Sequence, residues 1–490
     1  MLDDDGVRGI VDDMWRLHLS ERTYLDRIYG FTAGQLGAPH IPEGAEVEIQ
    51  DLARLSIKNV LGLVRDSFTQ NLCVIGYKSA LAKENAPAWD IWQRNRMDAR
   101  QAEVHRPAVT YGASYVVVTD GDEGSVWKTR SPRQILAVYV DPQVDVWPQY
   151  AFEQWIDSTD AHPRWKAMLY DDEYIYPLDL GSVPALGSSQ YETALAASQY
   201  QTLMARSLNI TDIGEPVRHG ASHCPVVRFV NARDADDLIV GEIEPLIRLQ
   251  QTLNSVNFDR LIASRFGAHP QKVITGWSGT SAEVLQASAR RVWAFEDADV
   301  KVDSFQPASL EQYNSVLEEI THHIAMVAQV SPGSVAGRMV NLSAEALAAS
   351  EANQQRKLMS KRDSFGESWE QCFRLAAEIE GDTATAADTS SEVMWRDTEA
   401  RAFGAIVDGI TKLTAAGVPI EELIDLVPGV NQQKAQSIKD ALRRGQTNQL
   451  LAALQGPPAP TTPPVLQQMP PAAPKPSPAN MPLSNGAVTR

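Results

Sequence analysis

Few residues of this chain have the types and spacing that chemistry requires. Asp171, Asp172 and Glu173 form a run of carboxylates, the side chains that bind divalent metal ions in nucleases. No histidine or lysine constellation accompanies this run, so a turn between two strands is the predicted structure. His322 and His323 are an adjacent histidine pair in a predicted helix. Because neighbouring helix residues point about 100° apart, this pair is predicted to be structural rather than metal-binding.

Other signatures of catalysis are absent from the sequence. It contains no GxxxxGK[ST], GxGxxG, HExxH or GxSxG pattern, so a nucleotide-driven motor is not predicted. His105 is a lone histidine, predicted to be packed or capped, and Asn341-Leu-Ser343 is explained better by Ser343 as a helix N-cap than as a glycosylation site. The isolated Cys73, Cys224 and Cys372 indicate neither a disulfide framework nor a zinc site. We therefore predict no catalytic residue, no metal, no cofactor and no enzymatic activity.

Two basic positions remain as candidates for binding. Lys272, Arg290 and Arg291 fall in a small predicted module, and Arg338 falls with Asn341 in the glycine-rich loop 331–341. Taken alone, each basic residue is more often a surface ion-pair partner than a binding residue.

The composition bounds the class of protein. The chain has 490 residues with 43% hydrophobic and 22% charged residues, and no stretch approaches the roughly 18 apolar residues of a membrane-spanning helix. The N-terminus lacks the layout of a signal peptide, which predicts a protein made and kept in cytoplasm. A net charge of −18 argues against a protein that grips nucleic acid by neutralising phosphates. Between 141 and 180 the chain has nine acidic residues and only two basic ones, Arg164 and Lys166. This stretch is therefore either a solubilising surface or a surface that repels DNA.

The hydrophobic pattern predicts helices followed by clustered strands, which is an α+β fold rather than alternating α/β. The expected helices span 7–29, 52–68 and 89–110, the first with Met14, Leu17, Tyr24, Leu25 and Ile28 on one side. The expected strands span 72–75, 115–118, 135–140, 152–156, 165–170 and 223–231, with a variable, partly mobile insertion at about 181–215.

Three long helices are predicted next, at 242–266, 309–330 and 343–379. The first has its apolar stripe at Leu246, Leu249 and Leu253, and the second at Leu317, Ile320 and Ile324. Both stripes suggest packing against other helices, with partners beyond one chain. Between the first two helices, 268–304 should hold strand 272–275, a helix at 282–288 and strand 292–295. Short helices follow at 399–444, and a proline-rich tail, with 11 of the 29 prolines, should be disordered.

Three segments in a fixed order carry a resemblance to a known family. They are Trp89–Val118 with its Tyr111-Gly112 corner, the run Pro225–Asn231 followed by Gly241–Glu244 and Leu249–Asn254, and Asn341–Leu347 followed by Lys357, Lys361, Phe365 and Trp369. Together they resemble the portal protein family of tailed bacteriophages, especially siphophages of actinobacterial hosts.

The resemblance implies a ring, usually of twelve subunits, at one capsid vertex. Double-stranded DNA would pass through it in packaging and ejection, without sequence-specific binding. Expected partners are the terminase large subunit, a head-completion adaptor, and the major capsid and scaffolding proteins. Such a protein is assembled in the host cytoplasm and resides in the virion.

The resemblance also implies a domain plan. It comprises a wing at 1–240, stem helices at 241–267 and 305–330 around a clip at 268–304, a tunnel-proximal loop at 331–342, a long helix returning to the wing at 343–394, a reduced crown at 395–445 and a disordered tail at 446–490. Arg338 and Asn341 become candidates for the DNA channel, and Lys272, Arg290 and Arg291 for terminase docking at the clip. The residues Leu246, Leu249, Leu253, Leu317, Ile320 and Ile324 would pack the stem.

Two rival functions stay open at this point. A phage nuclease or terminase-like enzyme would need a carboxylate cluster beside a basic groove, and the sequence indicates neither. A scaffold or minor head protein acting as an adhesive partner would keep the apolar stripes but would not need the compact insertion at 268–304.

Overall fold

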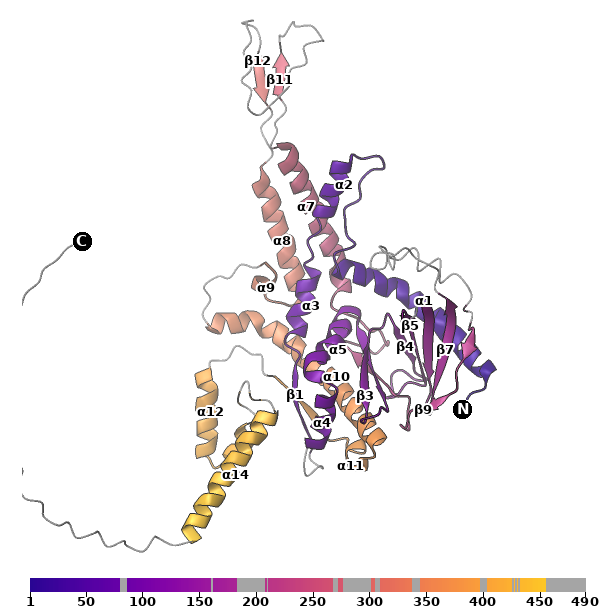
Figure 1. The fold of residues 1–490 in the computed structure, drawn as a ribbon. Helices are drawn as coiled ribbons and strands as arrows, with labels where there is room; N and C mark the ends of the chain where they lie inside the picture. Colours follow the sequence, from indigo (N-terminus) through magenta and orange to yellow (C-terminus); the bar gives the residue numbers. More distant parts are fainter. Residues whose placement is uncertain are drawn as a thin grey trace, which may run out of the picture. The chain divides into compact units, whose positions relative to one another are not determined.

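A computed structural model gives the fold of the chain (Figure 1). It describes residues 1–79, 86–159, 162–182, 208, 210–267, 272–275, 301–304, 309–336, 344–396, 403–424, 427, 430 and 432–454. The chain divides into two compact units, Met1–Ala435 and Gln436–Arg490. The first unit contains both helices and sheets, which confirms the predicted α+β class.

Two antiparallel sheets form the body of the first unit. The smaller has the order β10-β2-β3, with β2 at Ala113–Thr119, β3 at Val126–Arg130 and β10 at Val226–Val230. The larger has the order β4-β5-β6-β7-β8, with β9 also paired to β7. Its strands are β4 (Ile135–Val138), β5 (Tyr150–Asp157), β6 (Arg164–Tyr170), β7 (Tyr174–Ser182), β8 (Asp212–Ile213) and β9 (Val217–Arg218). Asp171–Glu173 is the turn between β6 and β7, as predicted, whereas β3 and β7 were not predicted.

Successive side chains along these strands point to opposite faces of the sheets, and this alternation gives the body its layers. Tyr115 and Val117 of β2 pack toward the larger sheet, while Val116 and Val118 pack toward the helices. The larger sheet alternates in the same way and turns Phe152 toward helix α1 (Asp4–Thr32). Because successive strand residues point to opposite faces, each sheet is covered on both sides. The layers therefore run from α1 through the two sheets to helices α5 (Met97–Tyr111) and α10 (Ala344–Glu380).

Helix α1 lies where it was predicted, and its apolar face is the predicted one only in part. Met14, Leu25 and Ile28 are buried, while Leu17 is 45% and Tyr24 41% exposed. The buried stripe follows Val7, Val11, Met14, His18, Arg22, Leu25 and Ile28. Hydrophobicity alone did not predict this stripe, because two of its buried residues are polar. His18 forms a hydrogen bond with the Pro132 carbonyl oxygen at 2.9 Å, and Arg22 pairs with Asp26.

Two helices predicted to be continuous are each divided into two helices. The one expected at 89–110 is α4 (Ala86–Arg94) and α5, separated at Arg96, whose φ is 55°. There the Asn95 amide group donates to the Ser125 carbonyl oxygen at 3.0 Å and accepts from the Trp127 N–H at 2.8 Å, so it ties the break to β3.

The helix expected at 52–68 is likewise two helices, α2 (Val47–Leu55) and α3 (Leu61–Thr69). The Lys58 N–H between them donates to Asn254 Oδ1 at 3.0 Å, so a side chain from a distant helix satisfies a backbone group that the break leaves open. The strand expected at 72–75 is β1 (Val74–Lys78), which continues through Gly76 and pairs with β13 (Glu392–Trp395).

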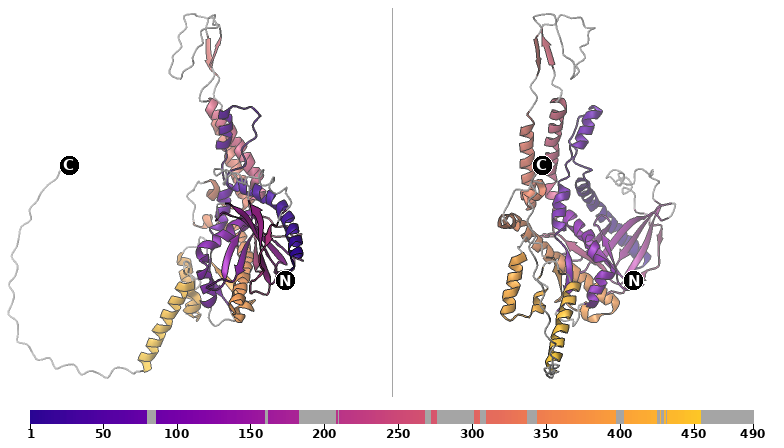
Figure 2. Two further views of the ribbon diagram at one scale, coloured as in Figure 1. Left: turned by 45° about the vertical axis from the view of Figure 1, so that its right-hand side comes forward. Right: turned by 60° about the vertical axis from the view of Figure 1, so that its left-hand side comes forward.

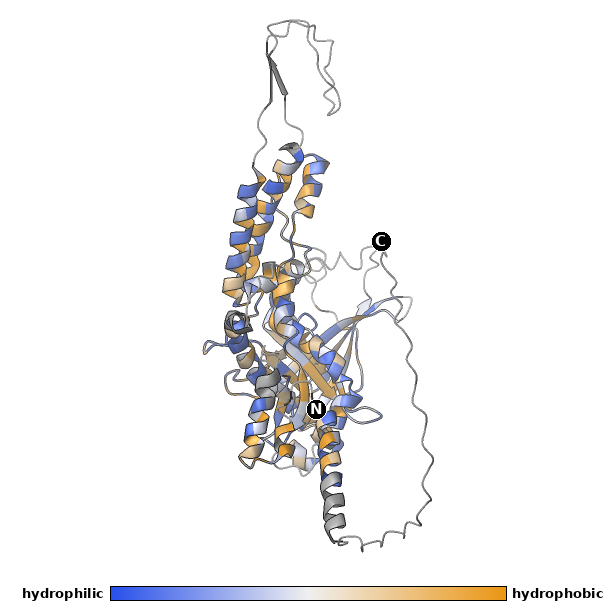
Figure 3. Cartoon of the chain, turned by 90° about the vertical axis from the view of Figure 1, so that its left-hand side faces the viewer, coloured by the Kyte–Doolittle hydropathy of each residue, from blue (hydrophilic) through white to orange (hydrophobic). Residues whose placement is uncertain are grey.

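The three long helices are confirmed. They are α7 (Ile247–Gly267), preceded by the short η1 (Glu244–Leu246), α8 (Leu310–Ala328) and α10. Helices α7 and α8 pack side by side in every view (Figures 1 and 2). Both carry hydrophobic and hydrophilic residues in alternation, as amphipathic helices do (Figure 3).

The apolar stripes of this pair do not need a second chain to cover them, contrary to the prediction. Leu246, Leu253, Leu317, Ile320 and Ile324 are all buried within one chain, and Leu249 is partly buried. The reason is that α8 packs against α7 and joins the core that α3 and α10 share. On α8 the exposed apolar residues are Leu310, Val316, Met326 and Val327, with exposed fractions from 37% to 67%.

The remaining elements fit the plan in part. Strand β11 (Lys272–Thr275) is confirmed and pairs with β12 (Lys301–Ser304), which was not predicted. The helix expected at 282–288 and the strand at 292–295 lie outside the described residues, as does most of 181–215. Helices α9 (Pro332–Ala336), α11 (Thr383–Ala386), α12 (Phe403–Ala415) and α13 (Ile420–Leu423) are short. Helix α14 (Gln432–Leu454) continues into the predicted tail, of which residues 455–490 are not described. Among the described residues, no helix has the length and apolar character needed to cross a membrane.

Candidate functional site

The predicted site residues fall mostly outside the described residues. This holds for Arg290, Arg291, Arg338 and Asn341, while Lys272 is the first residue of β11. Their roles therefore stay predictions. His322 and His323 are both exposed on α8.

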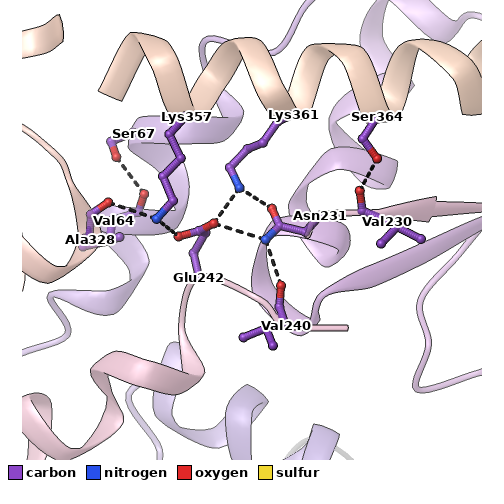
Figure 4. Close-up of polar contacts among 10 residues, drawn as sticks. All are labelled: Val64, Ser67, Val230, Asn231, Val240, Glu242, Ala328, Lys357, Lys361 and Ser364. Carbon is purple, nitrogen blue, oxygen red and sulfur yellow. Dashed lines mark hydrogen bonds and ion pairs between the residues drawn. The ribbon is translucent and has the colours of Figure 1, made fainter. Parts of the chain in front are cut away.

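The structure brings together a different set of polar residues, which we call the Glu242 cluster. It consists of Asn231, which follows β10, Glu242, which precedes η1 and α7, and Lys357 and Lys361 of α10 (Figure 4). Glu242 is 8% and Lys361 2% exposed. The cluster thus lies in the interior where the smaller sheet, the start of α7 and the long helix α10 meet.

Every member of the cluster has hydrogen-bond partners. Lys361 Nζ lies 2.5 Å from Glu242 Oε1 and donates to Asn231 Oδ1 at 2.6 Å. Lys357 pairs with the other carboxylate oxygen and also reaches the Ala328 carbonyl oxygen at the end of α8. The Asn231 amide N–H groups donate to Glu242 Oε1 at 3.1 Å and to the Val240 carbonyl oxygen at 2.9 Å. A buried network that is fully satisfied in this way fixes the relative positions of the elements that supply it.

Attraction between the opposite charges of the cluster opposes the effect of burial on their pKa values. Burial disfavours the charged carboxylate of Glu242, but attraction to Lys361 and Lys357 outweighs it and holds the pKa of Glu242 below its usual value. Burial lowers the pKa of the Lys361 ammonium group, and Glu242 opposes that change. Both ammonium groups also lie 5.4 Å from the centre of the Phe68 ring, which is within range of a cation–π attraction.

Two glycines let the backbone carry Glu242 to this position. Gly112, at the end of α5, has a φ of 103°, a conformation that favours glycine. A Cβ at Gly241 would lie 2.4 Å from the Thr110 carbonyl oxygen, which is closer than atoms can approach. The close contact allows the Glu242 N–H to donate to the Val109 carbonyl oxygen, and the Asn231 N–H to that of Gly112, both at 2.8 Å.

Helix α10 is also attached to the edge of the smaller sheet. Ser364 and Ser368 donate to the carbonyl oxygens of Val230 and Arg228 in β10, at 2.6 and 2.9 Å. Because β10 is an edge strand of its sheet, these bonds occupy acceptors that the sheet leaves open. The long helix is therefore held to the sheet at successive turns, next to the lysines of the cluster.

Trp92 of α4 belongs to an aromatic core beside this attachment. The Trp92 ring packs against Trp127 and Trp369, at centroid distances of 6.1 and 5.0 Å. His105 is packed and capped as predicted: Nδ1 lies 3.1 Å from the Leu72 carbonyl oxygen, and Nε2 accepts from the Trp369 indole N–H at 3.0 Å. This arrangement requires a neutral imidazole, and burial lowers the pKa of His105 to about 3.

The sequence contained every residue of the Glu242 cluster but no sign that they meet. Glu242, Asn231, Lys357 and Lys361 all occur in the segments that carried the resemblance. A usable signal was present in α10, where two lysines one helical turn apart interrupt a face that otherwise buries Leu358, Phe365 and Trp369. A lysine on a buried helix face needs an anionic partner, and Glu242 supplies it.

These features are those of a structural junction. Comparison with known proteins shows the family to which the chain belongs. The family model described as phage portal protein, SPP1 Gp6-like, matches residues 54–448. The chain therefore belongs to this family of portal proteins, and the predicted function as a portal protein, which forms the channel at a capsid vertex, is confirmed.

Individual relatives carry the same name. The portal protein of Mycobacterium phage L5 is 26% identical over 429 residues, which cover 81% of this chain and 83% of the relative. That of Mycobacterium phage D29 is 25% identical over 397 residues, 76% of each chain. A chain in the solved virion of a native gene transfer agent particle covers 80% of this chain and 96% of its own length, at 12% identity and a TM-score of 0.43.

Proposed function

We propose that this protein assembles into a homo-oligomeric ring of about twelve copies at one capsid vertex, with α7 and α8 as the stem around the channel. The match of residues 54–448 to the portal family supports the ring most directly, and the Glu242 cluster supports the role of α7 and α8 within each subunit. The cluster links the start of α7, the end of α8, helix α10 and the smaller sheet through one buried carboxylate. A subunit that transmits force between a helical pair and a sheet body needs such a rigid connection.

The domain plan follows the same reasoning and remains a proposal. The wing would be 1–240, the stem helices 241–267 and 305–330, the clip 268–304, the tunnel-proximal loop 331–342, the helix returning to the wing 343–394, and the crown 395–445. The pairing of β11 with β12 in the chain between α7 and α8 supports a small module in the clip position.

The partners are proposed from the family and from charge. Double-stranded DNA would pass a predominantly acidic protein, so few phosphates would find a lasting partner. Arg338 and Asn341 remain candidates for channel contacts, and Lys272, Arg290 and Arg291 for docking the terminase large subunit and later the head-completion adaptor. Contacts with the major capsid and scaffolding proteins would fall on the wing. The ring would assemble in the host cytoplasm and then become part of the virion. We propose no catalytic role.

The ring can be tested at the exposed apolar residues of α8. Val316 is 42% and Met326 67% exposed within one chain, so Val316→Asp and Met326→Asp should leave the subunit folded. If α8 packs against neighbouring subunits, both changes should shift the mass measured by mass photometry from ring to monomer. Leu317→Asp serves as contrast, because Leu317 is 5% exposed and a charge there should unfold the subunit itself.

The wild-type result decides the function and the variants decide the interface. Negative-stain images of the purified protein should show rings with a central hole, whereas monomers or filaments would favour the scaffold or minor head protein. If the wild-type protein and both aspartate variants all form rings, α8 is not part of the subunit interface, although the protein still forms a ring.

A further inference from the structure

A hollow of about 460 Å³ opens on the surface between α1 and the segment that leads into α7. We call it the acidic hollow. The described residues that line it are Ser20, Glu21, Tyr24, Leu238, Ile239, Val240 and Glu244. Two of these residues are glutamates and none is basic, while Leu238, Ile239 and Val240 are apolar. The combination of carboxylates and apolar surface is typical of a site for a long cationic side chain.

The rim of the hollow exposes large apolar side chains. Leu238 is 60% and Tyr24 41% exposed, and Leu17 lies two turns before Tyr24 on α1 with 45% exposed. The tyrosine ring can also attract a cation through its face. Clustered apolar groups of this size on a surface usually mark a place of contact with another molecule.

A second loop extends this apolar surface. Val140, Val144 and Val146 expose 75%, 74% and 53% of their area. Their loop is fastened to the segment before Leu238, since the Gln143 amide donates to the Ala235 carbonyl oxygen at 2.6 Å. The valines and the acidic hollow therefore belong to neighbouring parts of one surface.

The protein does not fully compensate the charge of the Glu21 carboxylate. Burial raises the pKa of Glu21, and Arg228 only partly opposes this change. The Arg228 guanidinium lies 4.1 Å from the centre of the Tyr139 ring, so it is engaged elsewhere. Burial also raises the pKa of the Tyr24 hydroxyl, and the nearby Glu244 raises it further. A cation placed beside Glu21 in the hollow would therefore be stabilised.

Charge also indicates the source of that cation. Asp141 and Asp145 stand next to the valines in the chain, Asp234 and Asp236 precede Leu238, and the whole chain carries a net charge of −18. A second copy of the chain would bring the same excess of negative charge to this surface, and like charges disfavour such a contact. A different protein with a basic segment would meet complementary charge.

We propose that the acidic hollow and the adjacent valines form a docking surface for an arginine- or lysine-bearing apolar segment of another protein of the virion. This inference rests on the proposed portal function, because only an assembled particle brings such a partner to the surface. The cation would lie between Glu21 and Glu244 against the Tyr24 ring, and the flanking apolar residues would cover Leu238 and the valines.

A defined peptide tests the chemistry of the site. The probe is N-trifluoroacetyl-Leu-Arg-Leu-amide, followed by fluorine NMR as the full-length protein is added. Binding should weaken by roughly tenfold, about 1.4 kcal/mol, when citrulline replaces arginine in the peptide, and by a similar factor in the Glu21→Gln/Glu244→Gln protein. The control Asp13→Asn/Asp90→Asn changes the net charge by the same amount at two exposed positions and should bind like wild type.

Two results would overturn the proposal. One is equal binding of the arginine and citrulline peptides, or equal loss in the control protein, because either would reduce the effect to general attraction by an acidic chain. The other comes from Tyr24→p-benzoylphenylalanine in purified rings: a photo-crosslink between two copies would show that a second subunit occupies the hollow. The Glu21→Gln/Glu244→Gln protein should still form rings. Loss of peptide binding in rings that form normally concerns the docking surface alone, whereas loss of the rings themselves would concern the proposed portal function.

Discussion

Lys361 Nζ lies 2.5 Å from Glu242 Oε1 in the interior of the protein, and this pair joins the helix α10 to the entrance of α7. The two residues are 119 positions apart in the chain, so the contact closes a long loop of the fold. A buried ion pair contributes little net stability over a well-packed apolar pair, but the loss of one partner leaves an uncompensated charge in the interior. The cluster is therefore a point where small substitutions should have large effects.

The first prediction follows from this asymmetry. Glu242→Ala leaves two ammonium groups without their carboxylate, and we expect a loss of about 3–5 kcal/mol in the free energy of unfolding, measured by denaturant titration. Lys357→Ala should cost less, because the Lys357 side chain is 26% exposed and water can replace it. Equal losses of unfolding free energy in the two variants would show that the Glu242 carboxylate is no more important to the cluster than Lys357.

A second prediction concerns the backbone contact that supports the cluster. Gly241→Ala places a Cβ 2.4 Å from the Thr110 carbonyl oxygen, so the segment that carries Glu242 must move away from the end of α5. We expect a lower melting temperature. Gly9→Ala in α1 is the matched control, because a Cβ there meets nothing within 4 Å and alanine favours a helix by about 0.5–1 kcal/mol. A Gly241→Ala protein that melts at the wild-type temperature would contradict the importance of the contact.

The sequence predicted the class of fold and the three long helices because their apolar periods are long and regular. It failed where polar side chains decide the structure. Asn95 breaks a helix that hydrophobic period alone would continue, because its amide bonds β3. The Glu242 cluster was hidden for a related reason: spacing along the chain cannot show that Asn231 and Lys361 share a partner. The separation of buried from exposed residues on α8 likewise depends on packing against α7.

The third prediction is a pH dependence that arises from His105. Burial lowers its pKa to about 3 in the folded protein, while the unfolded chain has the ordinary value near 6.5. The unfolded state therefore binds the proton first as pH falls. The contribution of a neutral His105 is fully present above pH 6.5 and is lost as pH falls from there toward 3, by up to about 1.4 kcal/mol per pH unit.

His105→Phe provides the measurement. At pH 7.5 the variant should be less stable by about 1–3 kcal/mol, because the Trp369 indole N–H and the Leu72 carbonyl oxygen lose their partner. The difference between wild type and variant should shrink between pH 6.5 and 5, as followed by the denaturant midpoint at each pH. A difference that stays constant over this range would mean that His105 does not carry the pH dependence.

The last prediction concerns the proposed channel. A basic residue in the tunnel-proximal loop would be repeated once per subunit around the bore, so a single arginine could become a ring of charge that slows DNA transiently. Arg338→Ala should therefore allow ring and prohead assembly but change the packaging yield or the retention of DNA. Arg338→Glu should have the larger effect, because it replaces attraction to phosphate by repulsion. Ser334→Ala, an uncharged change at an exposed position nearby, is the control for disturbance of the loop. If both Arg338 variants package and retain DNA like wild type, this side chain does not contact the duplex, and the acidic character of the protein would suffice to let DNA pass.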